Sequence, residues 1–62
     1  MITGQVLRKE RRDAEVNVSE VARLMGLSRQ TVHRIEKGTE PLGPERIKAY
    51  RRALEQAAES KG

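Results

Sequence analysis

The stretch over residues 17–37 constrains the fold of this chain more than any other part of the sequence. In its first half, Val21 and Met25 stand four residues apart. In its second half, Val32 and Ile35 stand three residues apart. Residues at these spacings lie on one side of an α-helix. The pattern therefore predicts two short helices, each with one apolar side and one polar side.

The residues around these two helices predict how they begin and how they meet. Gly26 can adopt a positive φ without steric penalty, so it can end the first helix and redirect the chain. Asn17 and Ser28 can cap the two helices, because a side-chain oxygen at such a position accepts a hydrogen bond from a free backbone N–H. Ala22 is small where the helices would cross closely. Together these features predict a helix-turn-helix over residues 17–38.

A further helix is expected before this unit. It runs from about residue 4 to residue 13 or 14, with Thr3 as its N-cap and with Val6 and Leu7 facing inward. Neither proline nor glycine marks the turn that follows, so the sequence leaves the position of that turn open.

A long last helix is expected after the only clear loop, residues 39–44, in which two prolines and one glycine break any helix. This helix runs from 44 to about 59, and its apolar residues recur at three- and four-residue steps: Ile47, Tyr50, Ala53, Leu54, Ala57 and Ala58. The sequence thus predicts one all-α domain of four helices over residues 1–62. Leu54, Ala57 and Ala58 lie beyond what the core needs, so they would either contact a second copy or cap the core.

The charge of the chain favours a polyanionic partner. The chain has 13 Lys and Arg residues against 9 Asp and Glu residues, a formal net charge of +4, and such a balance favours nucleic acid. Tyr50 is the only aromatic residue, whereas single strands and RNA loops are usually bound by stacking on aromatic side chains. We therefore expect double-stranded DNA as the partner.

Other classes of protein fit the composition poorly. There is no cysteine and one histidine, and the carboxylates are scattered among opposite charges, so we expect no enzymatic activity, metal, cofactor or small-molecule ligand. No apolar run approaches the ~20 residues that span a bilayer. The N-terminus also lacks an apolar signal core, so a cytoplasmic location without membrane contact is expected.

The third expected helix, residues 29–37, has one side suited to reading DNA. At about 100° per residue, Arg29, Gln30, His33 and Arg34 fall in one outward sector, opposite the predicted core positions Val32 and Ile35. Arginine matches the O6 and N7 acceptors of guanine, and glutamine matches adenine N6 and N7. Thr31 adds a hydroxyl and a methyl group, and His33 would contact bases or phosphate.

The sequence resembles the Cro/C1-type helix-turn-helix family, also called the XRE family, from residue 3 to residue 54. The matching segments are Val21-Ala22, Met25-Gly26-Leu27-Ser28, Thr31-Val32 and Arg34-Ile35-Glu36-Lys37-Gly38. Matches outside them are Thr3-Gly4, Leu7-Arg8, Arg11, Glu45, Ile47, Ala53 and Leu54. The resemblance implies a lambda-repressor-like fold and DNA binding. It also implies that Arg29, Gln30 and Arg34 contact bases, while Asn17 and Ser28 contact phosphates.

The resemblance further implies an ion pair between Arg11 and Glu36, which would bridge the first and third helices. Two positions depart from the family. Val18 stands where a phosphate-contacting glutamine is often found, and the loop after Gly38 has Glu40 where a cation is often found. These departures should weaken backbone binding or shift it to other cations: Arg12, Lys37 and Arg46.

Two functions remain open from the sequence. The leading one is a sequence-specific transcriptional regulator, most simply a repressor that binds an inverted repeat as a homodimer, with half-sites ~34 Å apart. Its control would come from its concentration or from a regulatory protein partner. The alternative is a protein-interaction module, such as an antitoxin or anti-repressor, that acts through its last helix.

Overall fold

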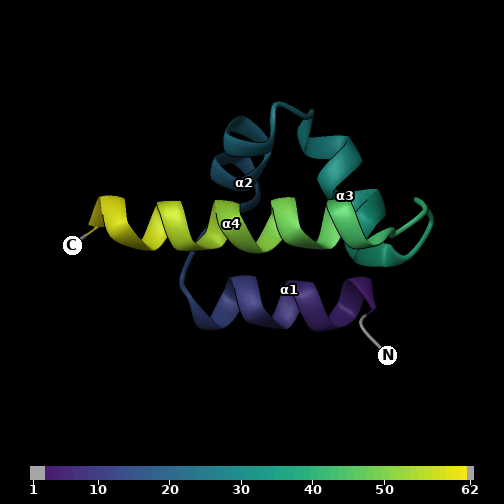
Figure 1. Cartoon of the computed structure of the whole chain (residues 1–62), viewed down its shortest axis with the longest axis horizontal. Helices are drawn as coiled ribbons and strands as arrows, with labels where there is room; N and C mark the ends of the chain where they lie inside the picture. Colours follow the sequence, from purple (N-terminus) through teal and green to yellow (C-terminus); the bar gives the residue numbers. More distant parts are fainter. Residues whose placement is uncertain (1–2, 62) are drawn as a thin grey trace.

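The structure, a computed structural model, describes residues 3–61, which form four helices and no strand. The helices are α1 (Gly4–Asp13), α2 (Val18–Met25), α3 (Arg29–Lys37) and α4 (Pro44–Lys61). α1 and α4 lie side by side and run in the same direction, while α2 packs on α4 and α3 packs on α1 and α2 (Figure 1). The predicted all-α fold with a long last helix is confirmed. None of the helices in this part of the chain is both long and apolar enough to cross a membrane.

The first three helices begin at the predicted caps. The side-chain oxygens of Thr3, Asn17 and Ser28 each accept a hydrogen bond from the backbone N–H three residues later, at 3.3, 2.8 and 3.2 Å. Each bond satisfies one of the N–H groups that a helix start leaves free. The local sequence therefore fixes where α1, α2 and α3 begin.

The same helices end on residues with positive φ. Gly26 has φ 70° and Gly38 has φ 87°, values that glycine adopts without steric cost. The turn after α1, left open by the sequence, ends in the same way at Glu15, with φ 58°. There the Val16 N–H donates to the Arg11 carbonyl at 3.1 Å, as in helix endings that normally use glycine.

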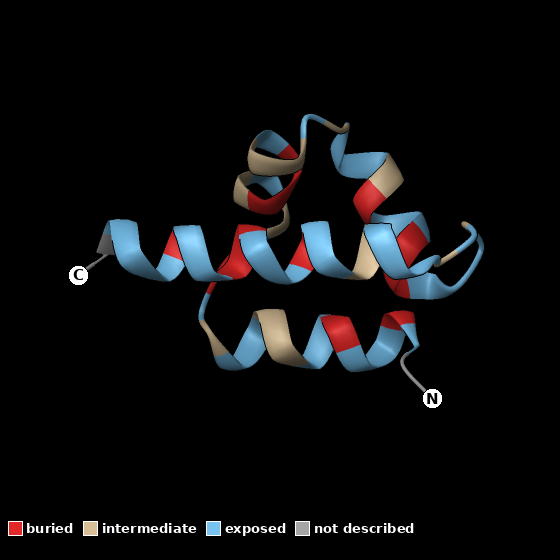
Figure 2. Ribbon diagram, in the orientation of Figure 1, coloured by how far each residue is buried: buried red, intermediate tan, exposed pale blue. Residues whose placement is uncertain are grey.

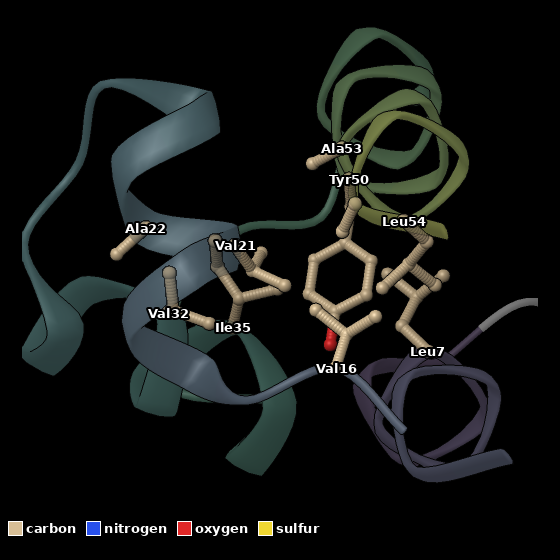
Figure 3. Packing of buried hydrophobic residues seen from close by; sticks show 10 residues of the cluster. Leu7, Val16, Val21, Ala22, Val32, Ile35, Tyr50, Ala53 and Leu54 are labelled. Atoms are coloured by element: carbon tan, nitrogen blue, oxygen red, sulfur yellow. The ribbon is translucent and has the colours of Figure 1, made fainter. Parts of the chain in front are cut away.

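The core lies where all four helices meet. Tyr50 reaches from α4 into its middle, with Val21 and Ile35 on one side of its ring and Leu7 and Leu54 on the other (Figure 3). Each helix turns its buried positions toward this cluster (Figure 2). The buried apolar residues are Leu7, Val16, Val21, Ala22, Val32, Ile35, Tyr50, Ala53, Leu54 and Ala57.

The burial of two sets of apolar residues, on α1 and on α4, differs from the expected one or decides between the expected alternatives. Val6 does not face inward: it is 38% exposed, whereas Leu7 is fully buried. On α4, Leu54 and Ala57 are buried in the core and only Ala58 of the proposed stripe is exposed. Of the two uses considered for that stripe, the structure shows capping of the core.

Gly4 makes a contact that the sequence did not reveal. A Cβ atom at this position would lie 2.0 Å from the Ile35 carbonyl oxygen and 2.9 Å from that of Glu36. No side chain fits there, so the first turn of α1 lies directly against the backbone of the last turns of α3. This contact fixes the distance between the two helices.

Candidate nucleic-acid interface

The outer side of α3 is polar and exposed (Figure 2). Arg29, Gln30, His33, Arg34 and Lys37 are all exposed on this helix. Val32 and Ile35, on the opposite side, are fully buried and hold the helix on the core. Four of the exposed residues line one surface hollow: Gln30, His33, Arg34 and Lys37. The division into a buried and an outward side is therefore the predicted one.

Thr31 and Ser28 belong to the start of α3 rather than to this hollow. The Ser28 hydroxyl accepts from the Thr31 N–H, and the two hydroxyl oxygens are 2.9 Å apart. Thr31 is half-buried, and its hydroxyl is engaged by this cap. The free N–H groups and the helix dipole at this end favour an anion.

The other predicted phosphate contacts lie at separate places. Asn17 caps α2 through its side-chain oxygen, which leaves its amide N–H groups as donors. Arg12 lines a hollow along α1, together with Gln5, Arg8, Lys9 and Asp13. Arg46 lies in the first turn of α4. Neither arginine lines the hollow on α3.

Glu40, in the loop after α3, lies between two of the predicted DNA contacts. Its carboxylate oxygens are 3.8 Å from Arg34 Nη1 and 3.9 Å from Arg46 Nη1. Its backbone N–H donates to the Arg34 carbonyl at 3.3 Å. The loop thus offsets part of the positive charge on this side of α3.

Arg11 and Glu36 form the ion pair that the resemblance implied. Arg11 Nε donates to Glu36 Oε2 at 2.8 Å, and Arg11 Nη2 donates to Oε1 at 3.2 Å. Arg11 Nη1 also donates to the Val16 carbonyl at 2.9 Å. These bonds connect α1, α3 and the turn before α2. They therefore fix the orientation of α3 from the side that packs against α1.

Tyr50, which was expected only as a core residue, is a third member of this network. Its hydroxyl donates to Glu36 Oε2 at 2.5 Å. Burial, and then the hydrogen bond to the charged Glu36, raise the pKa of the Tyr50 hydroxyl above its ordinary value of 10.0. The hydrogen bond to Glu36 raises the pKa of Arg11 as well. Glu36 is 4% exposed, and its carboxylate is fully engaged inside the protein.

The structure also brings together residues that the sequence analysis did not group. Gln5 and Arg8 of α1 line a groove with His33 and Lys37 of α3, and Arg11 and Glu36 complete its lining. A signal was present in the sequence, because Arg8 precedes Arg11 by three residues and so lies on the side of α1 that faces α3.

Among residues 3–61, no group of three His, Cys, Asp or Glu side chains is placed to hold a metal ion. The comparison with curated proteins and that with solved structures gave no match. A family model described as a helix-turn-helix domain matches residues 3–59. Since that match covers nearly the whole chain, and since the capped helices α2 and α3 meet at the turn of Gly26, the chain belongs to the helix-turn-helix domain family.

Proposed function

We propose that this chain is a sequence-specific regulator of transcription of the Cro/C1 type, which reads duplex DNA with α3. One observation carries the proposal: α3 presents an exposed polar side with three cations while its other side is locked into the core. An α-helix fits the major groove of B-DNA, where each base pair presents a distinct pattern of donors and acceptors.

Three side chains on α3 are proposed to read bases. Arg29 and Gln30 lie in the first turn, which a recognition helix places deepest in the groove. Arg34 follows one turn later and is 60% exposed even with Glu40 beside it. Arginine suits guanine and glutamine suits adenine, because each can make two hydrogen bonds to that base. Thr31 and His33 are proposed as lesser contributors.

Phosphate contacts are proposed around this helix. Ser28 and Asn17 stand at helix starts, whose free N–H groups attract anions. Lys37, Arg12 and Arg46 would add charge. Such contacts set the position of the protein on the duplex but carry little sequence information.

We further propose that the protein acts as a homodimer on an inverted repeat and represses by occupying a promoter. A second copy related by a two-fold axis would present its α3 to the major groove one helical turn away, at ~34 Å. The interaction-module alternative rests on the long last helix, which spans Pro44–Lys61. Leu54 and Ala57 of that helix are buried in the core, so they are not free to contact a partner.

Selection of binding sites from a randomised duplex pool tests the proposal. We expect an inverted repeat that binds far more tightly than scrambled DNA when both are titrated at two salt concentrations. Equal and strongly salt-dependent binding of both duplexes would show that charge attraction alone explains the affinity, and it would refute the proposal of a sequence-specific regulator.

Substitutions then test the assigned roles. Arg34→Ala should relax the preference at one base pair by about 1–3 kcal/mol, whereas Lys37→Ala should weaken all sequences alike. An equal loss on selected and scrambled DNA for both variants would contradict this division of roles.

A further inference from the structure

The groove between α1 and α3 has four exposed residues at its rim: Gln5, Arg8, His33 and Lys37. The proposed function uses His33 and Lys37 but gives no role to Gln5 and Arg8. Its deeper part is formed by Arg11 and by the buried Glu36. It adjoins the hollow on α3, since His33 and Lys37 line both. The surface of α3 therefore continues onto α1.

The charges of this groove favour an anion. The Glu36 carboxylate is neutralised by Arg11 and accepts from Tyr50, so it offers little negative charge to a ligand. Within the described part of the chain, neither Arg8 nor Lys37 has an ion-pair partner. Two cations thus face the groove without a compensating anion.

The two walls of the groove are held at a fixed distance. Gly4 places the first turn of α1 against the backbone of α3, and Arg11 joins the helices through two hydrogen bonds to Glu36. Arg8 lies one turn after Gly4 and one turn before Arg11. An anion bound there would therefore meet two helices whose separation is already set, so binding would not require the backbone to move.

The surface around Arg34, next to the loop after α3, is less positive than this groove. There Glu40 lies within 4.0 Å of both Arg34 and Arg46 and offsets part of their charge. A helix in the major groove has a phosphate backbone on each side of it. The unpaired cations on the α1 side are thus well placed for one of these two backbones.

We infer that the groove between α1 and α3 holds a phosphate of the DNA backbone, with Arg8 and Lys37 supplying charge and Gln5 a hydrogen-bond donor. This inference deepens the proposed function and relies on one part of it, the entry of α3 into the major groove. Arg8 becomes a phosphate-contacting residue, and α1 takes over backbone binding that Val18 and Glu40 do not provide.

Three variants and two duplexes test this assignment. Arg8→Ala removes the charge in the groove, and Arg8→Lys keeps it. Arg52→Ala removes the same charge from an exposed position on α4 that does not line the groove. Affinities for the selected duplex and for a random duplex are measured over a range of salt concentrations, after thermal unfolding has shown that each variant folds.

A phosphate contact gives a distinct pattern. Arg8→Ala should lower the affinity for both duplexes by the same factor, roughly five- to tenfold near 0.1 M salt, and should reduce the slope of log K against log salt by about 1. Arg8→Lys should restore most of that slope. Arg52→Ala should leave the slope unchanged.

Other results overturn the inference. If Arg8→Ala and Arg52→Ala have equal effects, only net charge matters, and the groove either stays empty or serves an acidic protein. A loss confined to the selected duplex would indicate a base contact instead. If the wild-type protein binds all duplexes alike, the proposal of a sequence-specific regulator is refuted. The affinity of Arg8→Ala for the random duplex then still shows whether Arg8 contacts a phosphate. Absence of binding to any duplex refutes both proposals.

Discussion

Two Arg–Glu pairs hold α1 in place, and they are nearly identical in geometry. Arg11 meets Glu36 of α3 with hydrogen bonds of 2.8 and 3.2 Å, and Arg51 of α4 meets Glu10 with bonds of 3.1 and 2.8 Å. Their surroundings differ: the side chains of the first pair are 13% and 4% exposed, and those of the second 43% and 36%. The two pairs thus differ in burial rather than in geometry.

Because the surroundings differ, the same contact has different consequences at the two junctions. In the buried pair, Glu36 also accepts from Tyr50 and Arg11 also donates to Val16, so removing one member leaves its partner desolvated and incompletely bonded. In the exposed pair, water replaces whatever is lost. We therefore expect α3, the proposed reading helix, to be held far more rigidly to α1 than α4 is by its ion pair.

The largest effect is expected for the buried pair. Arg11→Met leaves the Glu36 charge buried without its partner and should reduce the free energy of unfolding by about 3–5 kcal/mol. Unfolding by urea, followed by circular dichroism, measures this loss. The matched variant Arg51→Met removes the same group from the exposed pair. Similar losses for the two variants would show that burial does not distinguish the pairs.

A second test addresses the backbone contact that accompanies the buried pair. Gly4→Ala forces a methyl group into the Ile35 carbonyl and should destabilise the fold by about 1–3 kcal/mol, although alanine normally favours a helix. Gly43→Ala is the control, since nothing lies within 4 Å of a Cβ atom there. A higher melting temperature for Gly4→Ala would contradict the close approach of α1 and α3.

Tyr50→Phe tests the third member of the buried network. A hydrogen bond to a charged group typically contributes about 1.5–3 kcal/mol, and water cannot replace it at a fully buried site. We expect a loss at or below the lower end of this range, because Arg11 still neutralises Glu36 in the variant. Urea unfolding near neutral pH measures it. No loss would indicate that Arg11 alone satisfies the carboxylate.

The same tyrosine predicts a dependence on pH. Because its pKa is raised in the folded state, the unfolded chain releases the Tyr50 proton first as pH rises past 10.0, whereas the folded chain retains it. This contribution to stability is complete below pH 10.0 and is lost progressively above it. The wild-type protein should therefore lose its advantage over Tyr50→Phe in alkaline solution. A constant difference between them across this range would contradict the raised pKa.

The smallest effect is expected for the exposed pair. Arg51→Ala should alter stability little more than Arg52→Ala, the neighbouring substitution of an arginine with no ion-pair partner among residues 3–61. Any difference between the two variants should shrink when salt is added, because exposed charges are screened. Thermal unfolding at low and high salt measures both. A difference that persists in high salt would show that the exposed pair contributes to stability as the buried pair does.

The sequence predicted the helices well because their ends depend on local chemistry. Thr3, Asn17 and Ser28 are caps through bonds only three residues long, and Gly26 and Gly38 mark turns. Tertiary contacts were harder to predict. The side of α1 that faces α3 includes Gly4, Leu7 and Arg11, and only Leu7 carries an apolar signal, so Val6 was wrongly placed inside.

For the candidate site, the sequence predicted the outward side of α3 from helical periodicity alone. It did not predict the groove with Arg8, because that groove depends on how closely α1 approaches α3, and a missing side chain at Gly4 sets that distance. Nor did it place Glu40 between Arg34 and Arg46, since loop conformation decides that arrangement.

The burial of Leu54 and Ala57 has a consequence for the proposed assembly. With these residues used inside one copy, Val6 is the only large apolar side chain exposed among residues 3–61. Two copies would therefore meet through mostly polar surface and associate weakly in free solution. The DNA would then act as the template that brings them together, and occupancy of a paired site would rise with the square of protein concentration. A small change in synthesis would thus produce a steep change in promoter occupancy without any bound effector.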